Sequence, residues 1–133
     1  MNAEKQDKIR ETVLLVEDED IVRKLTHKIL TRLGYQVLVA CNGCDAFTQY
    51  QNHAEPIDLL LTDMIMPKMN GRDLYTKLKE QHPDLKVLFM SGYNESILAQ
   101  QDSVAANFFI QKPFSYESLA LKVREAIEQP ATA

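Results

Sequence analysis

The feature that most constrains the fold is a fivefold alternation between short apolar runs and longer amphipathic stretches. The apolar runs are continuous and do not alternate with polar residues, which is typical of strands covered on both faces. We therefore predict five buried strands. They fall at residues 13–16, 37–39, 59–61, 87–90 and 108–110.

The amphipathic stretches between these runs predict helices. Val22, Leu25, Ile29 and Leu33 recur at three- and four-residue spacing and end before Gly34, which predicts a helix end there. Such alternation of strand and helix implies right-handed crossovers and an α/β fold, a parallel sheet between two helix layers. The other helices are predicted near 44–52, 71–81 and 95–101 and over 119–127.

Length and charge narrow the class of protein. The chain has 133 residues, which suits one domain, and we expect it over 12–128, with short flexible tails at 1–11 and 129–133. Lys and Arg number 15 against 19 Asp and Glu, a net charge of −4. This balance argues against a broad basic face, so direct binding of nucleic acid is not expected.

The distribution of apolar and cysteine residues bears on location. The longest apolar runs have four to five residues, far short of a membrane span, and the first ten residues are too polar for a signal peptide. We expect a soluble, cytoplasmic protein without direct membrane contact. Cys41 and Cys44 have the spacing of redox or zinc motifs, but one pair is weak support for either role.

Polar residues follow several of the predicted strands, where a sheet of this kind binds ligands. Glu17 and Asp18 follow the first strand, Asp63 the third, Ser91 the fourth and Lys112 the fifth. Each has an ordinary alternative, such as a helix-capping acid, a turn aspartate or a loop serine. Their combination at one edge favours a site in which three carboxylates hold a hard cation such as Mg²⁺ and the lysine and serine bind phosphoryl oxygens.

Four segments carry a resemblance to a known family. They are Leu-Leu-Val-Glu-Asp-Glu at 14–19, Leu-Thr-Asp-Met-Ile-Met-Pro-Lys-Met-Asn-Gly at 61–71, Phe-Met-Ser-Gly-Tyr at 89–93 and Lys-Pro-Phe at 112–114. Together they resemble the receiver domain of bacterial two-component response regulators. The resemblance implies a flavodoxin-like (βα)5 fold with strand order 2-1-3-4-5 and five helices. It also implies a phosphoacceptor rather than an enzyme, with at most weak self-phosphorylation from small donors and autodephosphorylation.

The resemblance also implies roles for single residues. Asp63 would accept a phosphoryl group from a sensor histidine kinase or a histidine phosphotransfer domain. Phe109 would be an aromatic switch, although an aromatic in a buried strand is also ordinary core. Phosphorylation would change the surface of the fourth helix, the fifth strand and the fifth helix, and this surface would carry the signal. Mg²⁺ (or Mn²⁺) would be bound directly by Asp18, Asp63 and the backbone carbonyl of Ile65, and through water by Glu17. Ser91 and Lys112 would contact the phosphoryl oxygens. The peptide bond before Pro113 would be cis.

Three positions depart from the usual family pattern. Ile65 and Tyr93 stand where many relatives carry polar groups that position water, and Glu17 replaces the commoner Asp. Two other readings stay open, a small metal-dependent phosphatase with Asp63 as nucleophile and a receiver-like binding module that is not phosphorylated. Residues 89–93 resemble receivers at the C-terminal end of hybrid sensor histidine kinases, which favours that origin over a stand-alone regulator.

Overall fold

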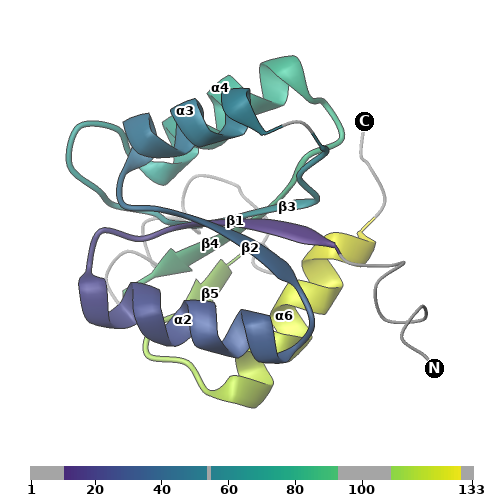
Figure 1. Ribbon diagram of the computed structural model, residues 1–133. Helices are drawn as coiled ribbons and strands as arrows, with labels where there is room; N and C mark the ends of the chain where they lie inside the picture. Colours follow the sequence, from purple (N-terminus) through teal and green to yellow (C-terminus); the bar gives the residue numbers. More distant parts are fainter. Residues whose placement is uncertain (1–10, 54, 93–108, 130–133) are drawn as a thin grey trace.

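Five parallel strands form one sheet in the order β2-β1-β3-β4-β5 (Figure 1). The computed structural model describes residues 11–53, 55–92 and 109–129. The predicted α/β fold and strand order are confirmed. The strands are β1 (Thr12–Val16), β2 (Gln36–Ala40), β3 (Leu59–Asp63), β4 (Lys86–Ser91) and β5 (Phe109–Gln111).

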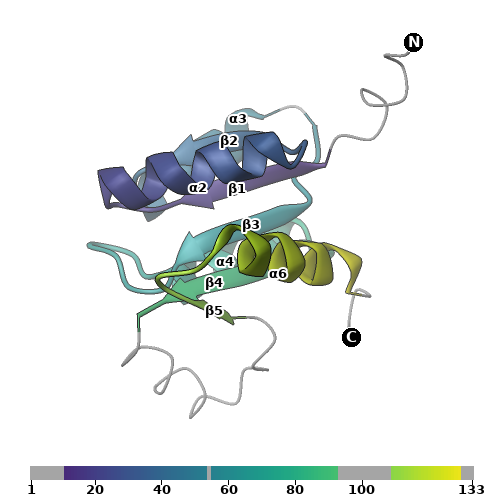
Figure 2. The ribbon, with the colours of Figure 1, turned by 90° about the horizontal axis from the view of Figure 1, so that it is seen from below.

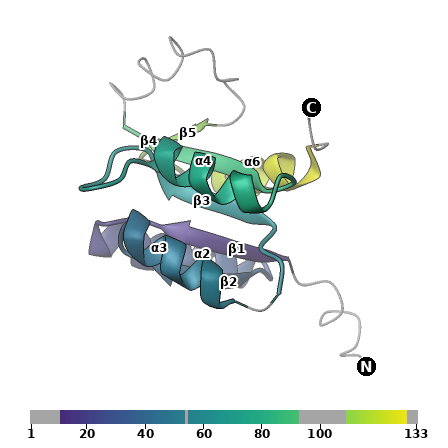
Figure 3. The same ribbon diagram turned by 90° about the horizontal axis from the view of Figure 1, so that it is seen from above.

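Helices cover both faces of the sheet. α3 and α4 lie on one face, as the view from above shows (Figure 3), and α2 and α6 lie on the other (Figure 2). The helix predicted near 95–101 lies outside the described residues, as do residues 1–10 and 130–133 of the predicted tails. The described helices are α2 (Asp20–Arg32), α3 (Gly43–Asn52), α4 (Gly71–Gln81) and α6 (Tyr116–Glu128).

The core consists of two apolar layers that the central strands separate. Along β1, Val13 and Leu15 pack toward α2 and α6, whereas Leu14 and Val16 pack toward α3 and α4. Every residue of β1 is buried, because helices cover both of its faces and strands pair with both of its edges. The prediction of a fully buried strand is wrong for β2, whose first four residues are only half-buried because this strand lies at the edge of the sheet.

The predicted apolar stripe on α2 needs one correction. Leu25 is 53% exposed, whereas Thr26 and Leu30 are fully buried. The Thr26 hydroxyl donates to the carbonyl of Val22 at 2.7 Å, so this polar side chain enters the core with its hydrogen bond made. The helix end before Gly34 is confirmed, since Gly34 has a φ of 102° directly after the C-cap residue.

The described helices are also short relative to a membrane. Within the described ranges, none combines the length and the apolar character that a membrane span needs. The four helices instead have one buried stripe each, and this stripe faces the sheet.

Candidate functional site

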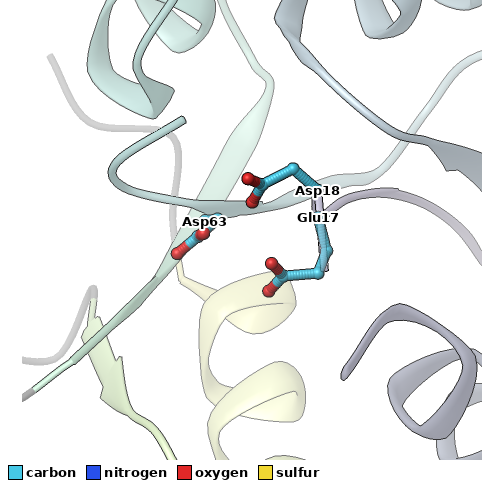
Figure 4. A group of neighbouring side chains, drawn as sticks. All are labelled: Glu17, Asp18 and Asp63. Atoms are coloured by element: carbon cyan, nitrogen blue, oxygen red, sulfur yellow. The ribbon is translucent and has the colours of Figure 1, made fainter. Parts of the chain in front are cut away.

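Three carboxylates meet at the edge of the sheet where the parallel strands end. Glu17 follows β1, Asp18 comes next, and Asp63 is the last residue of β3. One oxygen from each lies within 4.8 Å of the others, and both acids after β1 turn toward Asp63 (Figure 4). Glu17 is fully buried and Asp63 is 5% exposed, while Asp18 faces solvent. The predicted acidic cluster is therefore present.

Lys112 brings a positive charge into this cluster from the end of β5. Its Nζ lies 3.1 Å from Asp63 Oδ1 and 3.4 Å from Glu17 Oε1, and it is 3.9 Å from Glu19 Oε1. Its backbone N–H donates to the carbonyl of Ser91 at 2.8 Å, and the Lys112–Pro113 peptide bond is cis. The residues after β5 thus turn the lysine back over the strand ends.

The site holds more negative charge than one lysine balances. Burial, together with the nearby charge of Asp63, raises the pKa of Glu17 to about 7. Burial by itself lowers the pKa of Lys112, but the charges and hydrogen bonds of Asp63 and Glu17 outweigh it and raise that pKa. Oxygen donors with excess negative charge fit a small hard cation such as Mg²⁺.

The loop after β3 is held tightly against Asp63. The backbone N–H of Gly71 donates to the carbonyl of Met64 at 2.9 Å. A Cβ at Gly71 would lie 2.4 Å from the backbone oxygen of Asp63, so only glycine fits there. The same loop carries Ile65, a residue that is 55% exposed. This packing fixes the backbone on which the predicted acceptor stands.

The other predicted site residues lie on β4 and β5. Ser91 is fully buried at the end of β4 and pairs with Gln111 of β5. Phe109 is buried and stacks on Phe89, with ring centroids 5.4 Å apart and planes inclined by 29°. Phe89 in turn meets Tyr75 of α4 edge to face. Phe109 therefore belongs to the core layer under α3 and α4.

Sequence reasoning missed two residues that shape the site. Arg23 of α2 donates from Nη1 to the backbone carbonyl of Glu17 at 2.9 Å. From sequence alone, an arginine near the start of a helix is expected to be solvated. Gly71 lies inside the quoted motif, but its close approach to Asp63 depends on the loop path. Cys41 and Cys44 are exposed free thiols. Neither belongs to the potential metal-binding group of Glu17, Asp18 and Asp63.

The five-stranded parallel sheet, with three carboxylates and a lysine at the carboxyl ends of its strands, is typical of a class of signalling domain. Comparison with known proteins points to the same class. The model of the response regulator receiver domain family matches residues 13–124, and the chain belongs to this family. It is a receiver domain of the bacterial two-component type.

Two relatives from Brucella abortus show the range of proteins that contain such a domain. The chain is 40% identical to the sensor kinase CckA over 119 residues, which cover 89% of this chain but 13% of that kinase. It is 34% identical to the response regulator receiver protein CpdR over 117 residues, which cover 86% of this chain and 95% of that protein.

Solved structures agree at the level of the fold. The receiver domain of the hybrid histidine kinase CckA superposes with a TM-score of 0.71 at 32% identity, covering 88% of this chain and 99% of that one. A CheY-like receiver protein from Methanospirillum hungatei gives a TM-score of 0.75 at 26% identity, covering 90% of this chain and 95% of the other.

Proposed function

We propose that the chain is a phosphoacceptor domain in which Asp63 takes a phosphoryl group from a phosphohistidine. The observation that carries this proposal is the contact of Lys112 with Asp63, 3.1 Å from Nζ to Oδ1, inside a cluster of three carboxylates. Phosphoryl transfer asks a protein mainly for positioning and for charge neutralisation, and this edge of the sheet offers both.

In the transfer, a carboxylate oxygen of Asp63 forms a bond to phosphorus while the P–N bond of the donor breaks. The bonding electron pair returns to the imidazole nitrogen. Lys112 neutralises charge on the equatorial oxygens, and the Ser91 hydroxyl donates to one of them. Asp63 is held in place for this step by the packing of Gly71 against its carbonyl oxygen.

A divalent cation, Mg²⁺ or Mn²⁺, suits the donor set of the cluster. Asp18, Asp63 and the backbone carbonyl of Ile65 would hold it directly, and Glu17 would act through water. When bound, the cation offsets negative charge on the phosphoryl group. A phosphatase of the haloacid-dehalogenase type is a weaker alternative, because such an enzyme needs a second acid two residues after the nucleophile and Ile65 occupies that position.

The partner is a sensor histidine kinase or a histidine phosphotransfer domain. Identity of 40% to the sensor kinase CckA supports a kinase-linked role. The same identity supports the proposal that the chain is the receiver domain of a hybrid sensor kinase. Phosphorylation adds charge and acceptor oxygens beside Ser91. The signal would pass through Phe109 to β5 and α6, and to the helix predicted near 95–101, which lies outside the described residues.

Mass spectrometry after incubation with acetyl phosphate and Mg²⁺ tests the proposal. The parent protein should gain about 80 Da, one phosphoryl group, and Asp63→Asn should gain nothing while keeping its fold. Chelation of the metal should suppress the gain in the parent. A parent that gains no mass would indicate a receiver-like binding module, and a full gain in Asp63→Asn would refute the assignment of the acceptor.

A further inference from the structure

The acidic loop at the end of β1 is held by an unusual helix start. Helices α3, α4 and α6 begin with side-chain caps, in which Asn42, Asn70 and Ser115 accept from backbone N–H groups. The N-cap residue of α2 is Glu19, and its side chain makes no such bond. Its carboxylate is 3.9 Å from Lys112. The helix that follows the acidic pair therefore lacks the usual anchor at its first turn.

Arg23 supplies another anchor. Its backbone N–H donates to the carbonyl of Glu19 at 2.9 Å, and its side chain turns back toward the strand end. Nη1 donates to the carbonyl of Glu17 at 2.9 Å, and Nη2 pairs with the carboxylate of Asp20. The side chain is only 18% exposed. One guanidinium thus ties the end of β1 to the first turn of α2.

The carbonyl that Arg23 holds belongs to the peptide between the two acids of the site. The other polar groups of Glu17 also have partners: its N–H donates to Ala40, and its carboxylate accepts from the N–H of Glu19 and from Lys112. Asp18 is exposed, so the direction of its carboxylate depends on the backbone that carries it. Fixing the Glu17 carbonyl therefore fixes the backbone from which the Asp18 side chain reaches toward Asp63.

We propose that Arg23 is a positioning residue that holds the Glu17–Asp18 peptide in the orientation required for binding a divalent cation. The inference rests on the proposed function, because it assumes that the carboxylate cluster binds Mg²⁺. Arg23 acts through the backbone of Glu17, and its ion pair is with Asp20 on the helix side of the loop.

Charge and geometry predict opposite effects when Arg23 is replaced. Loss of a positive charge near an acidic cluster should strengthen cation binding, whereas loss of the hydrogen bond to Glu17 should weaken it. Lys24 offers a matched control, since it is the next residue on α2, exposed, and lines a surface hollow with Leu25 and Lys28. Arg23→Ala and Lys24→Ala change the net charge equally.

The test is calorimetric titration of the whole chain with Mg²⁺, together with melting temperatures in chelator to check the fold. Arg23→Ala should bind Mg²⁺ about five- to tenfold more weakly than the parent, which is within the range for the loss of one ordinary hydrogen bond. Lys24→Ala should bind as tightly as the parent or slightly tighter. Arg23→Lys keeps the charge but not the two-pronged donor, so its affinity should fall between the parent and Arg23→Ala.

Equal affinity in the parent and Arg23→Ala would overturn the inference and leave the proposed function standing. If Arg23→Ala does not fold, Arg23→Lys decides alone, and affinity equal to the parent's overturns the inference. A parent that binds no Mg²⁺ would overturn both the inference and the metal dependence in the proposed function.

Discussion

At the scale of single residues, the site depends on groups that are both buried and polar. Glu17 is fully buried yet carries a carboxylate, and Gly71 leaves no room for a side chain beside the backbone oxygen of Asp63. Such positions tolerate few substitutions, because each neighbouring group is held by its own hydrogen bonds.

Gly71→Ala should destabilise the protein by about 2 kcal/mol, because its Cβ would lie 2.4 Å from the Asp63 backbone oxygen and either the loop or the strand must move. Gly43→Ala is the control, since its Cβ would meet the side chain of Met69, at 2.9 Å. The nearest atom is Met69 Cβ, so the loop that carries Met69 must shift. A loop shifts more easily than the end of a central strand, so the loss should be smaller. Urea denaturation measures both, and equal losses would contradict the account.

The raised pKa of Glu17 predicts how stability depends on pH in the metal-free protein. The folded protein keeps the proton of Glu17 up to about pH 7, whereas the unfolded chain loses it near 4.5. Between these values the unfolded state binds fewer protons, so the free energy of unfolding should fall as pH rises and level off above about 7. Glu17→Gln should lack this part of the dependence.

The free energy of unfolding is measured by urea denaturation in the presence of chelator at about pH 5 and about pH 8, which lie on either side of the Glu17 transition. The parent should lose more stability than Glu17→Gln between the two conditions. The comparison with Glu17→Gln subtracts the contributions of all groups other than the Glu17 carboxyl. Parallel curves for the two proteins would show that the Glu17 carboxylate is not destabilised by its burial and by Asp63.

Ile65 predicts a long-lived acyl phosphate. Hydrolysis needs a water positioned opposite the Asp63 oxygen, and the exposed side chain of Ile65 offers that water no hydrogen bond. Tyr93, outside the described residues, is the other departure from polar positions in the family. The double variant Ile65→Asn and Tyr93→Glu should lose its phosphoryl group about tenfold faster. Decay followed after donor removal with Mg²⁺ present tests this, and equal or slower decay in the variant would refute it.

At the scale of elements, the strand ends position the site and the helix starts hold it. β1, β3 and β5 deliver Glu17, Asp63 and Lys112 to one edge because the strands are parallel. Three of the four described helices start with a side-chain cap, and α2 starts with the Arg23 anchor instead. The stability of the ordinary starts should therefore depend on single polar side chains.

Ser115→Ala should cost about 1 kcal/mol of unfolding free energy, because Ser115 Oγ accepts from the N–H of Ser118 at 3.0 Å at the start of α6. Ser118→Ala is the matched control on the same helix. Only the backbone of Ser118 contributes to the cap, and alanine is the better helix former, so this variant should be as stable as the parent or slightly more stable. A loss at Ser118 equal to that at Ser115 would contradict the role of the cap.

At the scale of the whole molecule, much of the fold could be predicted because local pattern and global topology agree. Continuous apolar runs predicted the strands, and the family motifs implied the strand order. The predictions for Leu25 and for β2 were wrong, because the pattern of apolar residues does not show which side chains face the core or where a strand lies in the sheet. Hydrophobic spacing on α2 fits Leu25 as well as its neighbours, and only packing shows that Thr26 is buried instead. An edge strand with apolar residues, such as β2, reads like a central one.

The candidate site was predictable to the same degree and for a similar reason. Motif residues at strand ends meet whenever the sheet is parallel, so Glu17, Asp18, Asp63 and Lys112 come together. The contact of Arg23 with a backbone carbonyl has no sequence signature, because a carbonyl has the same chemistry at every position. Supporting contacts of this kind require coordinates.

The most direct test of the central claim is to locate the phosphoryl group on the chain. Borohydride reduces an aspartyl phosphate to homoserine, so phosphorylation with acetyl phosphate and Mg²⁺, followed by reduction and peptide sequencing, identifies the acceptor residue. The account predicts homoserine at position 63 alone. Homoserine at Asp18 or another acid, or a phosphoryl group that stays on Ser91 after reduction, would contradict it.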